Sequence, residues 1–236
     1  MDMRIMQERL KQDPVYIKMF ADAGKGEPSN GGARSAIQEF LKSITSSGAP
    51  FDTGDLSASA KAGFELFKGK AGCAACHTGP RFTDDTPHNT GVAENPAIWS
   101  DPDRHVTFVT YAKFMGVENY MNVRRDLGAF VRDHKQESSG AFMTPSLREL
   151  TYTAPYMHNG TIASLEAVVE FYNRGGGNSA NKDKRLHPLD LTGEEKVNLV
   201  DFLKSLSGNS FDVPDYNPGE FDTEPPVIAD WRNQKN

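Results

Sequence analysis

The sequence is poor in cysteine, carries no excess of positive charge and has no long apolar run. Only two of its 236 residues are cysteine, Cys73 and Cys76, so it has too few for a disulfide framework or a four-cysteine metal site. The formal net charge of −6 argues against a surface for nucleic acid or anionic membranes. No apolar run approaches the ~20 residues that a transmembrane helix needs, so we expect no membrane span.

The two cysteines belong to one motif, C-x-x-C-H, which ends at His77. This is the attachment signature of a c-type haem. Thiols at positions i and i+3 lie on one face of a helical turn and can form thioethers to one porphyrin, and His77 is then delivered as the proximal iron ligand. A thioredoxin-like pair would need a strand-to-helix junction, and a zinc site would need further ligands. We therefore predict one covalent haem c; a chance occurrence of the motif is the remaining alternative.

A covalent haem also bears on where the protein works, because haem c in bacteria is normally attached outside the cytoplasm. The sequence starts Met-Asp-Met-Arg and continues into an amphipathic stretch, without the apolar segment of a signal peptide. We expect a periplasmic or otherwise extracytoplasmic protein. Its export signal was then removed, or the sequence begins inside a longer chain.

Apolar residues at helical spacing predict a mainly α fold. Three such stripes are Ile37, Phe40, Leu41 and Ile44; Ala60, Phe64 and Phe67; and Leu165, Val168, Val169 and Tyr172. A fourth helix is expected to begin at a capping box of Thr192 and Glu195 and to end at Gly208.

A helix leading into C-x-x-C-H and a capped terminal helix are typical of a cytochrome c-type haem domain, which we place at residues 51–208. Residues at about 86–140 are rich in turn formers and charge, and we interpret them as a long loop-rich insertion that covers the haem and includes a short two-stranded piece. Residues 209–236 are rich in Pro and Asp and are expected to form an extended tail.

Several motifs, in the same order, resemble the bacterial di-haem cytochrome c peroxidase and MauG family. They are GCAACHTGPRFTD at 72–84, HNTG at 88–91, FMTPSLR at 142–148, LTYTAPYMHNG at 150–160, and the segments 165–176 and 189–208. Together they cover about residues 50 to 208. One departure is Glu149, where the family usually has Asn.

The resemblance implies that residues 1–50 are the remnant of a preceding N-terminal haem domain and its linker. The chain would then be the second, electron-transfer haem domain of a di-haem peroxidase or MauG-like oxidase. It would relay electrons to a peroxide-reacting haem in the N-terminal domain or in a partner chain, and by itself would not be catalytic. Redox partners would be a small cytochrome, a cupredoxin or a protein substrate. The alternative is a stand-alone monohaem electron carrier.

The resemblance also implies roles for individual residues. The family's sixth iron ligand falls on Tyr172, which the helical pattern alone would assign to the core; Met115, Met143 and Met157 are the alternatives. His158 is expected near the haem, and Arg81 and Arg148 are expected to pair with its propionates. Backbone carbonyls of Thr153 and Pro155 match positions that hold a structural calcium, so Ca²⁺ is a possible second cofactor. His88 is expected only to order its loop.

Overall fold

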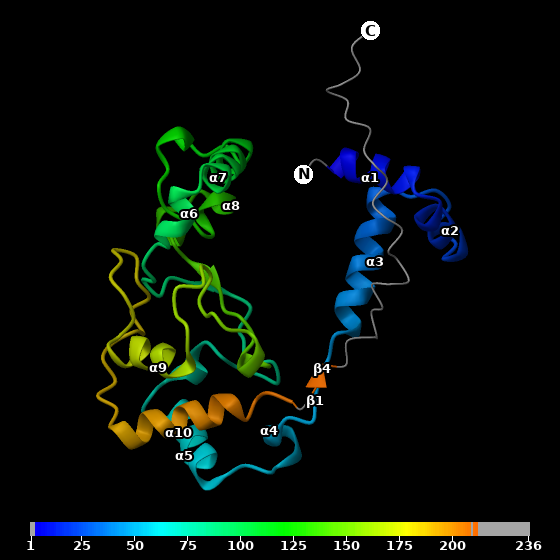
Figure 1. Ribbon diagram of the computed structural model, residues 1–236. Helices are drawn as coiled ribbons and strands as arrows, with labels where there is room; N and C mark the ends of the chain where they lie inside the picture. The colour runs from blue at the N-terminus through cyan, green and yellow to red at the C-terminus, as the bar shows by residue number, and fades with distance from the viewer. Residues whose placement is uncertain (1–2, 209, 212–236) are drawn as a thin grey trace. The chain divides into compact units, whose positions relative to one another are not determined.

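The computed structural model describes residues 3–208 and 210–211 and is mainly helical, as predicted (Figure 1). The described chain divides into two compact units, residues 3–45 and residues 46–210. Within the described ranges, no helix is long and apolar enough to cross a bilayer. The predicted tail at 209–236 lies outside the described residues, except for the strand β4 (Ser210–Phe211).

The first unit contains three helices. They are α1 (Met3–Gln12), α2 (Pro14–Asp22) and α3 (Asn30–Ser43). Asp13 caps α2 by accepting a hydrogen bond from the Val15 amide at 2.8 Å, and Ser29 caps α3 by accepting one from the Gly32 amide at 3.1 Å.

The first predicted apolar stripe lies on α3, so the prediction of a helix there is confirmed. The only buried residue of α3 is Ala33. The four stripe residues have exposed fractions between 37% and 60%: Ile37, Phe40, Leu41 and Ile44. A stripe of this kind is usually covered by a neighbouring element, and the other helices of residues 3–45 leave these side chains exposed.

The second unit is built on the packing of α5 (Ala58–Lys68) against α10 (Gly193–Lys204), with α9 (Leu165–Asn173) also lying on α10 (Figure 1). Five phenylalanine rings fill the space between these elements, with linked centroids 5.0–6.0 Å apart: Phe51, Phe64, Phe67, Phe82 and Phe202. This core holds the segment that follows α5 in place, because Cys73 and Ala74 pack against it.

The predicted capping box of α10 is confirmed. The Thr192 hydroxyl accepts from the Glu195 amide at 3.2 Å, and the Glu195 carboxylate accepts from the Thr192 amide at 2.8 Å. The same carboxylate pairs with Lys70 at 2.7 Å, which links the start of α10 to the segment between α5 and the haem motif.

The insertion is more helical than its composition suggested. It contains α6 (Pro96–Ser100), α7 (Pro102–Phe114) and α8 (Phe130–Asp133). A separate cluster of buried residues supports them: Ala112, Val117, Leu127 and Val131. The spacing of apolar residues did not predict α7, because the only buried residue of this helix is Ala112, whereas Val106 and Phe114 are exposed.

Short elements complete the second unit. They are α4 (Pro50–Thr53), β1 (Ser46–Ser47), β2 (Pro87–His88) and β3 (Phe142–Met143). β2 and β3 pair antiparallel, with His88 opposite Phe142, and β1 pairs with β4.

Gly63 permits the close approach of α5 to α10. A Cβ atom at Gly63 would overlap the backbone carbonyl of Asn198 on α10, and backbone cannot rotate away as a side chain can. We predict that Gly63→Ala lowers the free energy of unfolding by about 1–3 kcal/mol, as overpacking typically does. Thermal or urea unfolding of the haem-loaded chain measures this.

The matched control is Gly193→Ala at the start of α10. A Cβ there meets no atom within 4 Å, so this substitution should raise stability by up to ~1 kcal/mol. Equal effects of the two substitutions would show that the α5–α10 contact is not tight.

Candidate haem site

The C-x-x-C-H motif forms a tight turn after α5. Cys73–Ala75 is a short 3₁₀ turn, and Gly72 before it has φ 63°, in the left-handed region that favours glycine. The Cys73 carbonyl accepts from the amides of Cys76 at 3.2 Å and His77 at 3.0 Å. Both cysteines are free and partly buried.

Both thiols are protonated at neutral pH. Burial raises the pKa of Cys73 to about 12, and burial also raises the pKa of Cys76 although the charge of Arg185 opposes the shift. A redox-active C-x-x-C pair normally has a lowered cysteine pKa, so these shifts disfavour the thioredoxin-like interpretation.

His77 is oriented as a metal ligand. Its Nδ1–H donates to the Phe82 carbonyl at 2.8 Å, so in the neutral ring Nε2 is the nitrogen that carries the lone pair. Burial lowers the pKa of His77, with the Phe82 hydrogen bond acting in the opposite direction, so the imidazole is neutral. A neutral ring whose Nδ1 is bonded to a carbonyl is the form in which histidine binds iron through Nε2.

Tyr172, on α9, lies beside the two cysteines. Burial raises the pKa of its hydroxyl to about 12; the nearby Cys73 and Cys76 act in the same direction and a hydrogen bond with the Thr90 hydroxyl opposes them. The three methionines that are the alternative ligands lie on different segments. Met115 packs in the insertion's own cluster, Met143 is half exposed on β3, and Met157 is in the loop before α9.

A hollow of about 350 Å³ opens beside His77. Its apolar wall is formed by four rings: Phe51, Phe64, Phe67 and Phe82. His77 lines this hollow, whereas Cys73, Cys76 and Tyr172 do not. Two protonated thiols three residues apart, a neutral imidazole and a nearby phenol fit a covalent haem c. Cys73 and Cys76 would attach it, and His77 would bind its iron.

The two arginines predicted to meet propionates have other contacts. Arg81 pairs with Asp85 at 2.5 Å on the surface. Arg148 makes a bidentate pair with Asp52 at 2.8 and 2.9 Å and donates to the Pro80 carbonyl, so its guanidinium braces the loop after His77. Their roles toward propionates stay predictions.

His158 stacks face to face on Phe142, with ring centroids 3.5 Å apart and planes at 11°. Burial lowers its pKa, while the charges of Asp126 and Glu94 act in the opposite direction. Thr153 and Pro155, the predicted calcium positions, lie on an exposed loop whose Ala154–Pro155 peptide bond is cis. The haem role of His158 and the calcium site also stay predictions.

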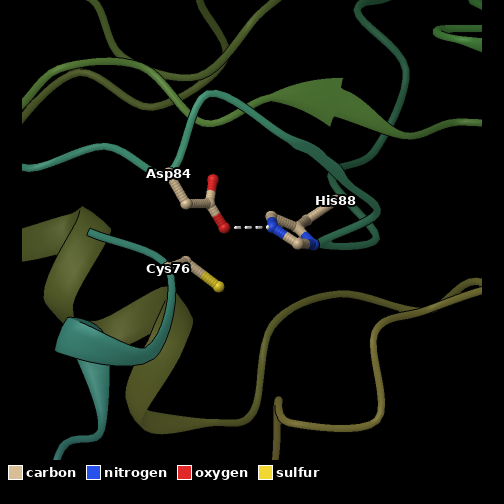
Figure 2. A group of neighbouring side chains, drawn as sticks. All are labelled: Cys76, Asp84 and His88. Carbon is tan, nitrogen blue, oxygen red and sulfur yellow. Dashed lines mark hydrogen bonds and ion pairs between the residues drawn. The ribbon is translucent and has the colours of Figure 1, made fainter. Parts of the chain in front are cut away.

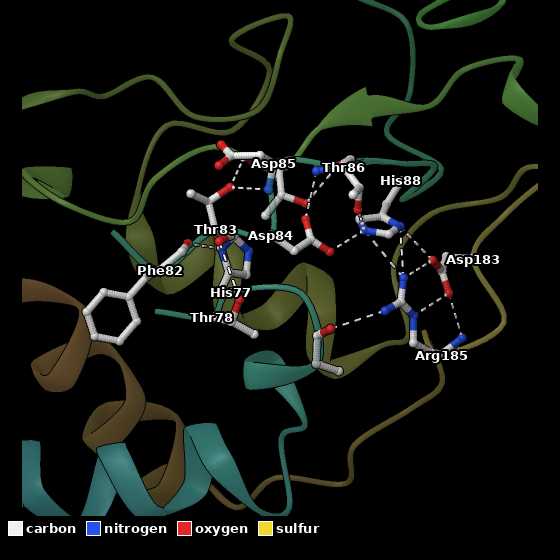
Figure 3. Close-up of polar contacts among 12 residues, drawn as sticks. His77, Thr78, Phe82, Thr83, Asp84, Asp85, Thr86, His88, Asp183 and Arg185 are labelled. Atoms are coloured by element: carbon white, nitrogen blue, oxygen red, sulfur yellow. Dashed lines mark hydrogen bonds and ion pairs between the residues drawn. The ribbon is translucent and has the colours of Figure 1, made fainter. Parts of the chain in front are cut away.

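A polar network beside Cys76 was not foreseen from the sequence. Ligand-type atoms of Cys76, Asp84 and His88 lie within 4.8 Å of one another (Figure 2), and Asp183 and Arg185 join them from the loop after α9 (Figure 3). Asp84 and His88 fall within motifs that carry the family resemblance, whereas Asp183 and Arg185 lie in a loop without any pattern.

The two carboxylates of this network are ionised. Burial opposes ionisation of Asp84, but hydrogen bonds, of which that from His88 is the strongest, outweigh it and hold its pKa well below the ordinary value. The Arg185 hydrogen bonds lower the pKa of Asp183, and Asp183 in turn raises that of Arg185.

The fold and the site define a cytochrome c-type haem domain. No protein-family model matches the chain. The chain is 44% identical over 232 residues to cytochrome-c peroxidase IdrP2 of Denitromonas iodatirespirans, a match that covers 94% of this chain. It is 37% identical over 216 residues to the methylamine utilization protein MauG of Methylorubrum extorquens, covering 87% of this chain.

Its structure is similar to the crystal structure of a MauG-like protein associated with microbial copper homeostasis. The TM-score is 0.66 at 26% identity, over 88% of this chain and 63% of that one. The chain belongs to the di-haem cytochrome c peroxidase and MauG family. It spans 62% of the length of the IdrP2 relative and 53% of the MauG relative.

We predict that replacing both cysteines, Cys73→Ala with Cys76→Ala, abolishes covalent haem. Haem that stays with the denatured chain on a gel measures attachment, because only thioethers survive denaturation. The control Ala75→Ser changes the same turn but keeps both thiols, and should retain the haem. Haem on the denatured double variant, or none on the parent chain produced with a haem-attachment system, would contradict the assignment.

Proposed function

We propose that this chain is the electron-transfer haem domain of a di-haem c-type peroxidase or MauG-like oxidase, with a single covalent haem. It relays electrons to a peroxide-reacting haem that a preceding domain or a partner chain carries. The observation that carries the proposal is the position of the Tyr172 hydroxyl beside Cys73 and Cys76.

The ligand set decides between relay and peroxide cleavage. When bound, the haem supplies one-electron redox chemistry at its iron. His77 would bind the iron through Nε2, and Tyr172 would bind it through its oxygen after losing the phenol proton. With both residues bound, no position would be left for peroxide, and a hard phenolate oxygen would favour ferric iron and a low potential. These are properties of a relay and not of a peroxide-cleaving centre.

The exposed stripe on α3 supports a partner that carries the second haem. Its four apolar side chains are uncovered in the described residues, and the curated relatives contain further chain. We propose that the N-terminal haem domain of the family, or a partner chain equivalent to it, covers this stripe. The electron donor or substrate would be a small cytochrome, a cupredoxin or a protein. The protein would work outside the cytoplasm. Ca²⁺ bound by the carbonyls of Thr153 and Pro155 would stabilise the contact between this domain and the one that carries the second haem.

The second candidate is a stand-alone monohaem electron carrier. The packing of the second unit favours it, because residues 46–210 contain their own core. Ligation by a methionine would support this candidate, since a thioether stabilises ferrous iron and raises the potential.

The test is near-infrared magnetic circular dichroism of the oxidised, haem-loaded chain beside Tyr172→Phe. We expect a His/tyrosinate spectrum in the parent chain, and a largely high-spin spectrum in the variant because phenylalanine offers no ligand atom. The control Tyr111→Phe alters an exposed tyrosine of α7 and should keep the parent spectrum. A His/Met charge-transfer band in the parent chain would contradict ligation by Tyr172 and favour the carrier.

A further inference from the structure

Four charged or titratable side chains from two loops meet beside the haem-attachment turn (Figure 3). Asp84 and His88 come from the loop after His77, and Asp183 and Arg185 come from the loop after α9. Asp84 accepts from His88 Nε2 at 2.8 Å. On the other side of the ring, His88 Nδ1 lies 2.8 Å from Arg185 Nη2 and 3.0 Å from an Asp183 carboxylate oxygen, so His88 is held from both loops.

Arg185 is the member that also contacts the haem motif. Its Nη1 donates to the carbonyl of Ala75, between the two cysteines, at 3.2 Å. Its Nε and Nη2 donate to the two carboxylate oxygens of Asp183 at 3.0 and 2.6 Å. One planar guanidinium therefore joins the attachment turn, His88 and the loop that carries Asp183.

The segment from His88 to Thr90 links this network to Tyr172. Its middle residue, Asn89, accepts at its carbonyl from the Asp183 amide at 2.9 Å, so a second bond ties the segment to the same loop. The Thr90 carbonyl then accepts from the Gly177 amide at 2.9 Å, in the glycine turn that follows Tyr172 at the end of α9. The contacts run from Ala75 to Arg185, to the His88–Thr90 segment, and to the turn after Tyr172.

We propose that Arg185 is a positioning residue that fixes the distance between the Cys73–His77 turn and the His88–Thr90 segment, and thereby the place of the Tyr172 hydroxyl relative to His77. The attachment turn bears His77, and the His88–Thr90 segment holds the turn that follows Tyr172 through the Gly177 amide. Loss of the guanidinium lets these two segments move apart. The inference rests on the proposed ligation by Tyr172.

Lys184 allows the effect of the Arg185 hydrogen bonds to be distinguished from the effect of its positive charge. It lies next to Arg185 and is exposed. Lys184→Gln removes the same charge from the same loop and breaks none of the network's contacts. Arg185→Lys keeps the charge but loses the fork that contacts three partners at once, and lysine does not reproduce that geometry. If Arg185 acted only through its charge, Arg185→Lys would keep the spin state of the parent chain. Lys184→Gln would then change the spin state as much as Arg185→Gln does.

The experiment measures spin state by electron paramagnetic resonance, and reduction potential by titration, in the full haem-loaded chain. We expect Arg185→Gln to have a several-fold larger high-spin fraction than the parent chain and a changed potential. Lys184→Gln should match the parent chain in spin state, and Arg185→Lys should lie between the parent chain and Arg185→Gln. A parent-like spin state in Arg185→Gln would overturn the proposal, as would complete rescue by Arg185→Lys or equal effects of both glutamine variants.

If Arg185→Gln does not accumulate with haem, His88→Phe provides the second test. It keeps a ring of similar shape and removes the hydrogen bonds to Asp84 and Arg185, so it should raise the high-spin fraction in the same direction. A parent-like spectrum in His88→Phe would then overturn the proposal. Failure of the proposed function would be seen in a different variant. A Tyr172→Phe spectrum identical to that of the parent chain would contradict ligation by Tyr172, whatever the Arg185 variants show.

Discussion

Both sides of the haem site are supported by one helix, α10. It packs against α5, whose end leads into the attachment turn, and against α9, which carries Tyr172. Burial of Phe202 and Leu199 against these neighbours contributes most of the stability of this packing. The ion pairs between α9 and α10, such as Lys196–Glu170 at 3.0 Å, are at least partly exposed and therefore contribute little. Helix packing thus sets where α5 and α9 lie, and the proposed role of Arg185 is to adjust the place of the Tyr172 hydroxyl within that frame.

The electrostatics of the site separate into an uncharged centre and a charged edge. Before haem is attached, burial raises the pKa of Cys73 and Tyr172 and lowers that of His77, so the centre carries no charge. Ligation by Tyr172 would require the loss of its phenol proton. At the Cys76 side, Asp183 and Arg185 neutralise each other. Such pairing holds the loops by direct hydrogen bonds, and the ionised Asp84 beside it leaves this edge with a negative group.

The features that could be predicted from the sequence are those encoded by residues close together in the chain. The C-x-x-C-H motif, the stripe of α5 and the capping box of α10 depend on residues a few positions apart. Tyr172 as a site residue needed the family resemblance, because its helical position alone indicates the core. Arg185 meets Ala75 and His88 only through tertiary folding, so no local pattern marks it. The helix α7 was missed because its small buried face leaves almost no apolar periodicity.

The central claim is that His77 and Tyr172 bind the iron of one covalent haem in this chain. A crystal structure of the haem-loaded, oxidised chain tests it most directly, by the distances from iron to His77 Nε2 and to Tyr172 Oη. The account predicts that both atoms are bonded to iron, with His77 Nδ1 still donating to the Phe82 carbonyl. A methionine sulfur on the iron, or an open sixth position with Tyr172 turned away, would contradict it.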